Sequence, residues 1–101
     1  MIQDLLIDLA NDIEEKLNEL QQLKQYLNHI EQHLEVVKDR AERLQPRLGE
    51  GETNDYLVRS RELEADKYYT EAAIEHLADQ ITRYKQQLYE LIIEKERQEQ
   101  E

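Results

Sequence analysis

Two histidines are the residues of this chain whose type and spacing come nearest to a chemical site. His29 and His33 are four residues apart, so on a helix both would project from one face. Such a pair could contribute to a zinc site if carboxylates completed the ligand set. The Glu-x-x-His pairs of di-iron bundles are missing, since Tyr26, Ile30 and Ala73 stand three residues before the histidines. We interpret the histidines as solvated and expect no metal or other cofactor.

Other arrangements of residues that could catalyse a reaction are also missing. Paired carboxylates such as Glu14 and Glu15 act as a general acid or base only where burial or a pocket shifts a pKa. The sequence has no Gly-rich phosphate loop, no Ser/His/Asp constellation and no cysteine. We therefore expect a protein that is not an enzyme and has no small-molecule substrate.

The elements that position these residues are predicted to be helices. Charged residues make up 37% of the chain, which has two Gly, one Pro, and no Phe or Trp. This composition is typical of long solvated helices, and no run of alternating β-branched residues predicts a strand. The fold class expected from the sequence is all-α.

The first part of the chain carries a heptad repeat, with apolar residues at alternating spacings of three and four. Thirteen of its fourteen a and d positions are apolar, and Lys16 is the exception. Such a repeat predicts a coiled-coil seam. The d positions are Ile2, Leu9, Lys16, Leu23, Ile30, Val37 and Leu44, and the a positions are Leu6, Ile13, Leu20, Leu27, Leu34, Ala41 and Leu48.

A bend is predicted where Pro46, Gly49 and Gly51 interrupt the repeat. Proline ends a helix, and glycine adopts the positive φ of a tight turn at little cost. Thr53 or Asn54 could then cap a second helix. We expect one helical hairpin over residues 1–101, with helices over about 2–46 and 54–97, a turn over about 47–53, and a frayed acidic tail over 98–101.

The repeat resumes after the bend, with a weaker pattern at first. Its a positions are Ser60, Lys67, Ile74, Ile81, Leu88 and Lys95, and its d positions are Tyr56, Leu63, Thr70, Leu77, Tyr84 and Leu91. A competing stripe is formed by Leu57, Ala65, Tyr68 and Ala72, so the helix could rotate locally or follow a longer repeat over residues 57–72.

A short connection between two helices makes them antiparallel neighbours. If the bend centres near residue 50, the numbers of facing core residues sum to about 101, and both repeats then fit a single register. This register pairs Val37 with Leu63, Ala41 with Ser60, Lys16 with Tyr84, and Lys38 with Glu64. Lys16 could be a polar core residue that fixes the register, or its amine could extend to solvent while Leu17 takes the core contact.

Additional apolar residues lie outside the a and d positions, mostly near the two chain ends. They are Leu5, Ile7, Ala10, Leu17, Ala78, Tyr89, Ile92 and Ile93. They could be ordinary scattered surface residues. A wider apolar face is typical of bundles with more than two helices, so we predict a homodimer that forms a four-helix bundle through these residues.

Arginines gather near the bend in a chain otherwise poor in positive charge. Arg43, Arg47 and Arg59 could dock an acidic partner, or could simply pair in solvent with neighbouring glutamates.

The charge and hydropathy of the chain restrict the classes of partner that it could bind. A net charge of −11 repels phosphate backbones and anionic lipid surfaces, so we expect neither nucleic-acid nor membrane binding. No stretch approaches the ~18 apolar residues of a membrane span. The start, residues 1–4, lacks the basic region of a signal peptide, so we expect a cytoplasmic protein.

Three functions fit these expectations. The first is a coiled-coil structural or adaptor protein that mediates protein–protein assembly with itself or with another helical protein. The second is a small regulator or chaperone that sequesters a partner's amphipathic helix. The third is an acidic mimic of nucleic acid, which would compete with DNA in a salt-sensitive manner.

Overall fold

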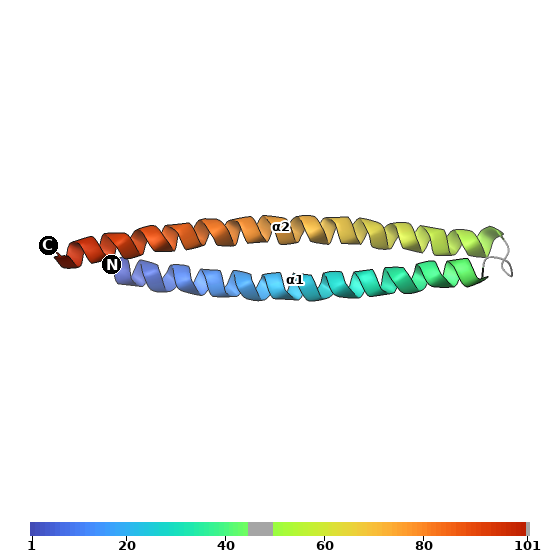
Figure 1. Cartoon of the computed structure of the whole chain (residues 1–101), viewed down its shortest axis with the longest axis horizontal. Coiled ribbons are helices and arrows are strands. Elements are labelled where there is room, and N and C mark those ends of the chain that lie inside the picture. The colour runs from blue at the N-terminus through green and yellow to red at the C-terminus, as the bar shows by residue number, and fades with distance from the viewer. Residues whose placement is uncertain (45–49, 101) are drawn as a thin grey trace. The chain divides into compact units, whose positions relative to one another are not determined.

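The chain is an all-α helical hairpin, as the sequence predicts (Figure 1). The computed structural model describes the backbone of residues 1–44 and 50–100 and the side chains of residues 1–43 and 55–100. It contains α1 (Ile2–Leu44) and α2 (Glu50–Gln100), with no strand in the described ranges. Two compact units share these helices. Unit 1 consists of Met1–Gln22 and Ile74–Glu101, and unit 2 consists of Leu23–Ala73.

α2 differs at its inner end from the predicted boundary. α1 is described through Leu44, so its predicted end near residue 46 and the predicted bend at Pro46 and Gly49 lie outside the described residues. α2 begins at Glu50, four residues before the predicted start, so Gly51 is helical and does not adopt a positive φ. One glycine inside a helix costs only about 1 kcal/mol, and acidic residues at positions 50 and 52 suit the positive end of the helix dipole.

The outer end of α2 extends further than predicted. The helix continues through Gln100 rather than ending near residue 97. The Lys95 ammonium lies 4.0 Å from a carboxylate oxygen of Glu99, one turn further along the helix. A lysine near a helix C-terminus also suits the negative end of the dipole, which partly offsets the acidic residues there.

The heptad repeat correctly predicts which side chains are buried. Every described a or d residue is buried or half-buried, and every other described side chain of α1 is exposed. The buried residues are Ile13, Ile30, Leu34, Val37, Leu63, Thr70, Leu77 and Ile81, all at a or d positions. Because apolar residues are concentrated in this narrow seam, neither helix is apolar enough over its described length to cross a membrane.

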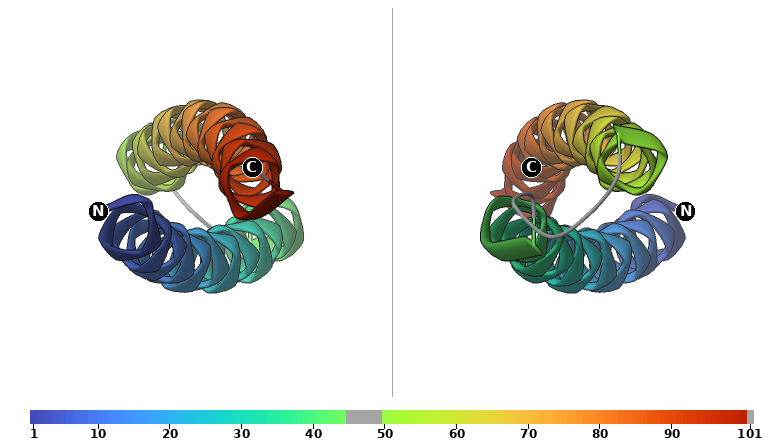
Figure 2. Two further views of the ribbon diagram at one scale, coloured as in Figure 1. Left: turned by 90° about the vertical axis from the view of Figure 1, so that its left-hand side faces the viewer. Right: turned by 90° about the vertical axis from the view of Figure 1, so that its right-hand side faces the viewer.

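In unit 1 the helix segments run antiparallel, with both chain termini at the same end (Figures 1 and 2). The Lys16 ammonium lies 5.5 Å from the centre of the Tyr84 ring, a cation–π distance, as the register predicts. The alternative in which Leu17 takes this core position is wrong, because Leu17 is exposed. The long methylene stem lets Lys16 cover the core while its ammonium group lies over the Tyr84 ring.

In unit 2 the same register brings together an apolar cluster and an ion pair. Val37 and Leu63, which the sequence pairs, belong to one buried cluster that also contains Ile30 and Leu34, with Tyr56 packed against it. The Lys38 ammonium lies 2.9 Å from a Glu64 carboxylate oxygen. The residue numbers of the two contacts across the seam, Lys16 with Tyr84 and Lys38 with Glu64, sum to 100 and 102. Both values agree with the predicted register.

The competing stripe of α2 does not enter the core. Leu57 and Tyr68 are 46% and 72% exposed, and Ala65 and Ala72 are also exposed. Thr70 occupies the seam instead and is buried. The helix therefore keeps its heptad phase through residues 57–72, since rotation toward the stripe would remove Leu63 from its cluster.

Truncation of the seam should destabilise the protein far more than truncation of an exposed aromatic residue. For Leu63→Ala we expect a loss of about 2–5 kcal/mol in the free energy of unfolding, because Leu63 is only 3% exposed. The control Tyr69→Ala, at a side chain 78% exposed, should change it by less than about 0.5 kcal/mol. Urea denaturation followed by circular dichroism at one protein concentration measures both. Equal losses would contradict the predicted seam.

The ion pair between Lys38 and Glu64 should contribute little to stability, because both side chains are about half exposed. A double-mutant cycle with Lys38→Ala and Glu64→Ala should give a coupling of about 0.2–1 kcal/mol that falls as salt is added. A coupling that does not respond to salt would mean that the two side chains interact through packing rather than charge.

Candidate interaction surface

One side of unit 1 carries apolar side chains that the seam does not use. When the a and d positions of two antiparallel helices face each other, the b and e positions of both helices share one side. In unit 1 the apolar residues on this side are Ile7, Ala10 and Leu17 of α1 and Ala78, Tyr89 and Ile92 of α2. The other b and e positions are polar, and they hold Gln3, Glu14, Gln21, Glu75, Thr82, Lys85, Glu96 and Glu99. We call the six apolar residues the unit 1 apolar face.

Most of the unit 1 apolar face is open to solvent. Its four large side chains are between 42% and 60% exposed, Ala10 is exposed, and Ala78 is half-buried. Large apolar side chains that lie together on a surface mark sites of protein–protein contact more often than scattered ones do. The unit 1 apolar face is therefore the strongest candidate for a binding surface in unit 1.

The opposite side of unit 1 is polar. Its c and g positions carry Leu5, Asp8, Asp12, Glu15, Glu19 and Gln22 of α1 and His76, Gln80, Arg83, Gln87, Glu90, Glu94 and Arg97 of α2. Within the helices, Leu5 is the one apolar residue on this side and is 54% exposed. Ile93, at an f position, is half-buried and also lies outside the unit 1 apolar face. The register thus groups six of the eight predicted interface residues and separates Leu5 and Ile93 from them.

Three polar residues interrupt the unit 1 apolar face near its middle. Glu14 at b and Lys85 at e are exposed and oppositely charged, and neither forms an ion pair with another described side chain. Thr82 at b donates its hydroxyl to the Ala78 carbonyl oxygen at 3.1 Å. That bond satisfies the Thr82 hydroxyl within its own helix, whereas Glu14 and Lys85 are exposed to solvent.

The arginines near the bend are engaged within their own helices. Arg43 Nε lies 3.2 Å from Asp39, and an Arg59 guanidinium nitrogen lies 3.3 Å from Glu62. Arg47 lies outside the described residues. These pairings fit the interpretation of solvated arginines better than that of a docking site.

The predicted histidine pair does not become part of a larger ligand set. His29 and His33 are both exposed. Within residues 1–44 and 50–100, no three His, Cys, Asp or Glu side chains lie close enough together to hold a metal ion. Two histidines alone provide only half of a tetrahedral zinc site.

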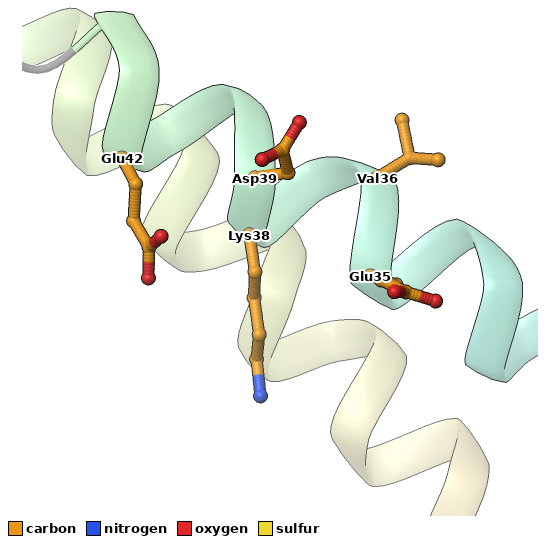
Figure 3. Close-up of a pocket in the computed structure, with 5 residues that line it drawn as sticks. All are labelled: Glu35, Val36, Lys38, Asp39 and Glu42. Carbon is orange, nitrogen blue, oxygen red and sulfur yellow. The ribbon is translucent and has the colours of Figure 1, made fainter.

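An open groove of about 550 Å³ runs along α1 in unit 2 (Figure 3). Its lining residues are Glu35, Val36, Lys38, Asp39 and Glu42, all of them exposed. Lys38 points toward α2, where it binds Glu64, while Val36 and Asp39 point to another side. The groove therefore lacks converging groups that could bind or polarise a substrate.

In unit 2, α2 also exposes two separate pairs of apolar residues, Leu57 with Val58 and Tyr68 with Tyr69, which sequence reasoning did not single out as a binding surface. Tyr68 and Tyr69 are 72% and 78% exposed, and Leu57 and Val58 are also exposed. These residues occupy b, c, e and f positions, so the heptad phase alone would have placed them outside the seam.

The interactions available at these surfaces are burial of apolar side chains and pairing of charges. Of the surfaces described, the unit 1 apolar face contains the most apolar residues, so we base the proposed function on it. No protein-family model, no curated protein sequence and no solved structure matches this chain.

Proposed function

We propose that this protein is a non-enzymatic structural or adaptor protein that acts through helix–helix packing, and that two copies join through the unit 1 apolar face into a four-helix bundle. The observation that carries the proposal is the asymmetry of unit 1. Its b and e side exposes Ile7, Leu17, Tyr89 and Ile92, whereas within the helices its c and g side is polar apart from Leu5. In a helix pair that binds no partner, we would expect polar side chains on both sides.

The size of the unit 1 apolar face suits a reversible dimer. Full burial of one large apolar side chain contributes about 1.5–3 kcal/mol. Two copies would bury eight such side chains that are each about half exposed, which gives roughly 6–12 kcal/mol. Association costs about 4–15 kcal/mol in lost freedom of motion. Because the gain and the cost are similar, the dimer should depend on protein concentration.

The adaptor part of the proposal concerns unit 2. There α2 exposes Leu57, Val58, Tyr68 and Tyr69, none of which belongs to the unit 1 apolar face. Exposed tyrosines are enriched at protein interfaces because they bury a large area with few rotatable bonds. The chain's charge of −11 favours another helical protein over nucleic acid as the partner.

The alternative occupant of the unit 1 apolar face is an amphipathic helix of another protein, as in a small chaperone or regulator. Such a protein would be monomeric in isolation, whereas a self-assembling adaptor dimerises without any partner. The oligomeric state of the purified chain therefore separates the two functions.

Sedimentation equilibrium should give a concentration-dependent dimer for the wild-type chain and a monomer for Ile7→Glu. The substitution places a charge in the proposed interface, and we expect the dissociation constant to rise at least 100-fold. Leu5→Glu is the matched control, since Leu5 and Ile7 are 54% and 52% exposed on opposite sides of the same helical turn. The control should leave the dimer intact.

Circular dichroism on the same samples checks that both variants remain helical. A wild-type chain that stays monomeric at millimolar concentration would overturn the proposed dimer. Equal weakening by Leu5→Glu and Ile7→Glu would mean that the unit 1 apolar face is not the interface.

A further inference from the structure

The unit 1 apolar face has an order along its length that restricts how a second copy can dock. With Lys16 level with Tyr84, four pairs lie at nearly the same height on the two helices. They are Ile7 with Ile92, Ala10 with Tyr89, Glu14 with Lys85, and Leu17 with Thr82. In each pair the residue numbers sum to 99, one less than for Lys16 and Tyr84, which is about 1.5 Å along a helix.

Two symmetric arrangements bring the unit 1 apolar faces of two copies together. If the two-fold axis is parallel to the helices, heights are preserved, and α1 of one copy lies against α2 of the other. If the axis crosses the helices at right angles, heights are reversed, and α1 lies against α1 and α2 against α2. Both arrangements are isologous and close as dimers.

The two charged residues distinguish these arrangements. Glu14 and Lys85 lie near the middle of the face along the helix axis. Ile7 and Ile92 lie nearer the chain termini, and Leu17 and Ala78 lie further from the termini. A crossing axis with full overlap therefore brings Glu14 against the partner's Glu14 and Lys85 against the partner's Lys85. A parallel axis brings Glu14 against the partner's Lys85 twice. Like charges in a partly desolvated interface are repulsive, and opposite charges are attractive.

The apolar pairs agree with the parallel axis in size. Ile7 meets the partner's Ile92, and the small Ala10 leaves room for the partner's Tyr89. Leu17 meets the partner's Thr82, whose hydroxyl is already bonded to the Ala78 carbonyl oxygen and leaves its methyl group for packing. Alternation of large and small residues across facing positions allows layers to interdigitate.

We propose that the second copy docks with the two-fold axis parallel to the helices, so that α1 packs against the partner's α2 and Glu14 pairs with the partner's Lys85. This inference rests on the proposed dimer and adds its register and orientation. It also brings the four chain termini of the two copies to one end of the unit 1 bundle.

Cysteine cross-linking tests this orientation, because the chain contains no native cysteine. Two variants, Glu14→Cys and Lys85→Cys, are treated separately and as an equimolar mixture with a short bis-maleimide. In the mixture, a heterodimer places the two cysteines together and keeps the second charge pair intact. We expect covalent dimer in the mixture at least five-fold above either variant alone. Leu5→Cys, on the polar side, is the matched control and should not cross-link.

Strong cross-linking of each single variant with itself would overturn the parallel axis and favour the crossing one. Absence of any cross-link while the wild-type chain sediments as a dimer would overturn the docking register but leave the proposed dimer standing. A wild-type chain that is monomeric and does not cross-link would overturn both proposals.

Discussion

Burial of the a and d side chains against one another in a single register is the interaction on which the rest of the structure depends. Each helix supplies only two residues in seven to the seam, so a slip would expose Leu63 or Ile81 and bury charged neighbours. The polar residues of the seam are compatible with this register. Lys16 rests its ammonium on Tyr84, and Thr70 is buried without leaving an unpaired polar atom among the described side chains.

The sequence predicts the seam almost completely because period and burial are directly linked in a coiled coil. Alternating spacings of three and four place Ile13, Ile30 and Leu34 on one stripe, and those residues are buried. The heptad phase of residues 57–72 of α2 was harder to predict, because Leu57 and Tyr68 are as apolar as the neighbouring residues of the true seam. Its phase is fixed by contacts with α1, above all the cluster of Leu63 and Val37, which no local pattern reveals.

The remaining differences have local causes. The start of α2 at Glu50 could not be read from the sequence, because glycine weakens a helix without ending it and several residues there could serve as the cap. The side chain that fills the core at Lys16 depends on the neighbouring Tyr84 ring, and Leu17 is more apolar but points away. For the candidate surface, the sequence identified the surplus apolar residues. Their heptad positions already place six of them on one side of the predicted hairpin, and the contacts across the seam agree with that register.

The placement of exposed apolar side chains on one side of unit 1 determines what this unit can bind. A seam of two residues in seven leaves the remaining side chains available to solvent or to a partner, and in unit 1 most of the large exposed apolar residues lie on one side. The most direct test of this account is the rate of thiol modification at Ile7→Cys and Leu5→Cys as the protein concentration rises. The account predicts that the cysteine at position 7 becomes protected as dimer forms, while the one at position 5 reacts at a constant rate. Equal rates at every concentration would contradict it.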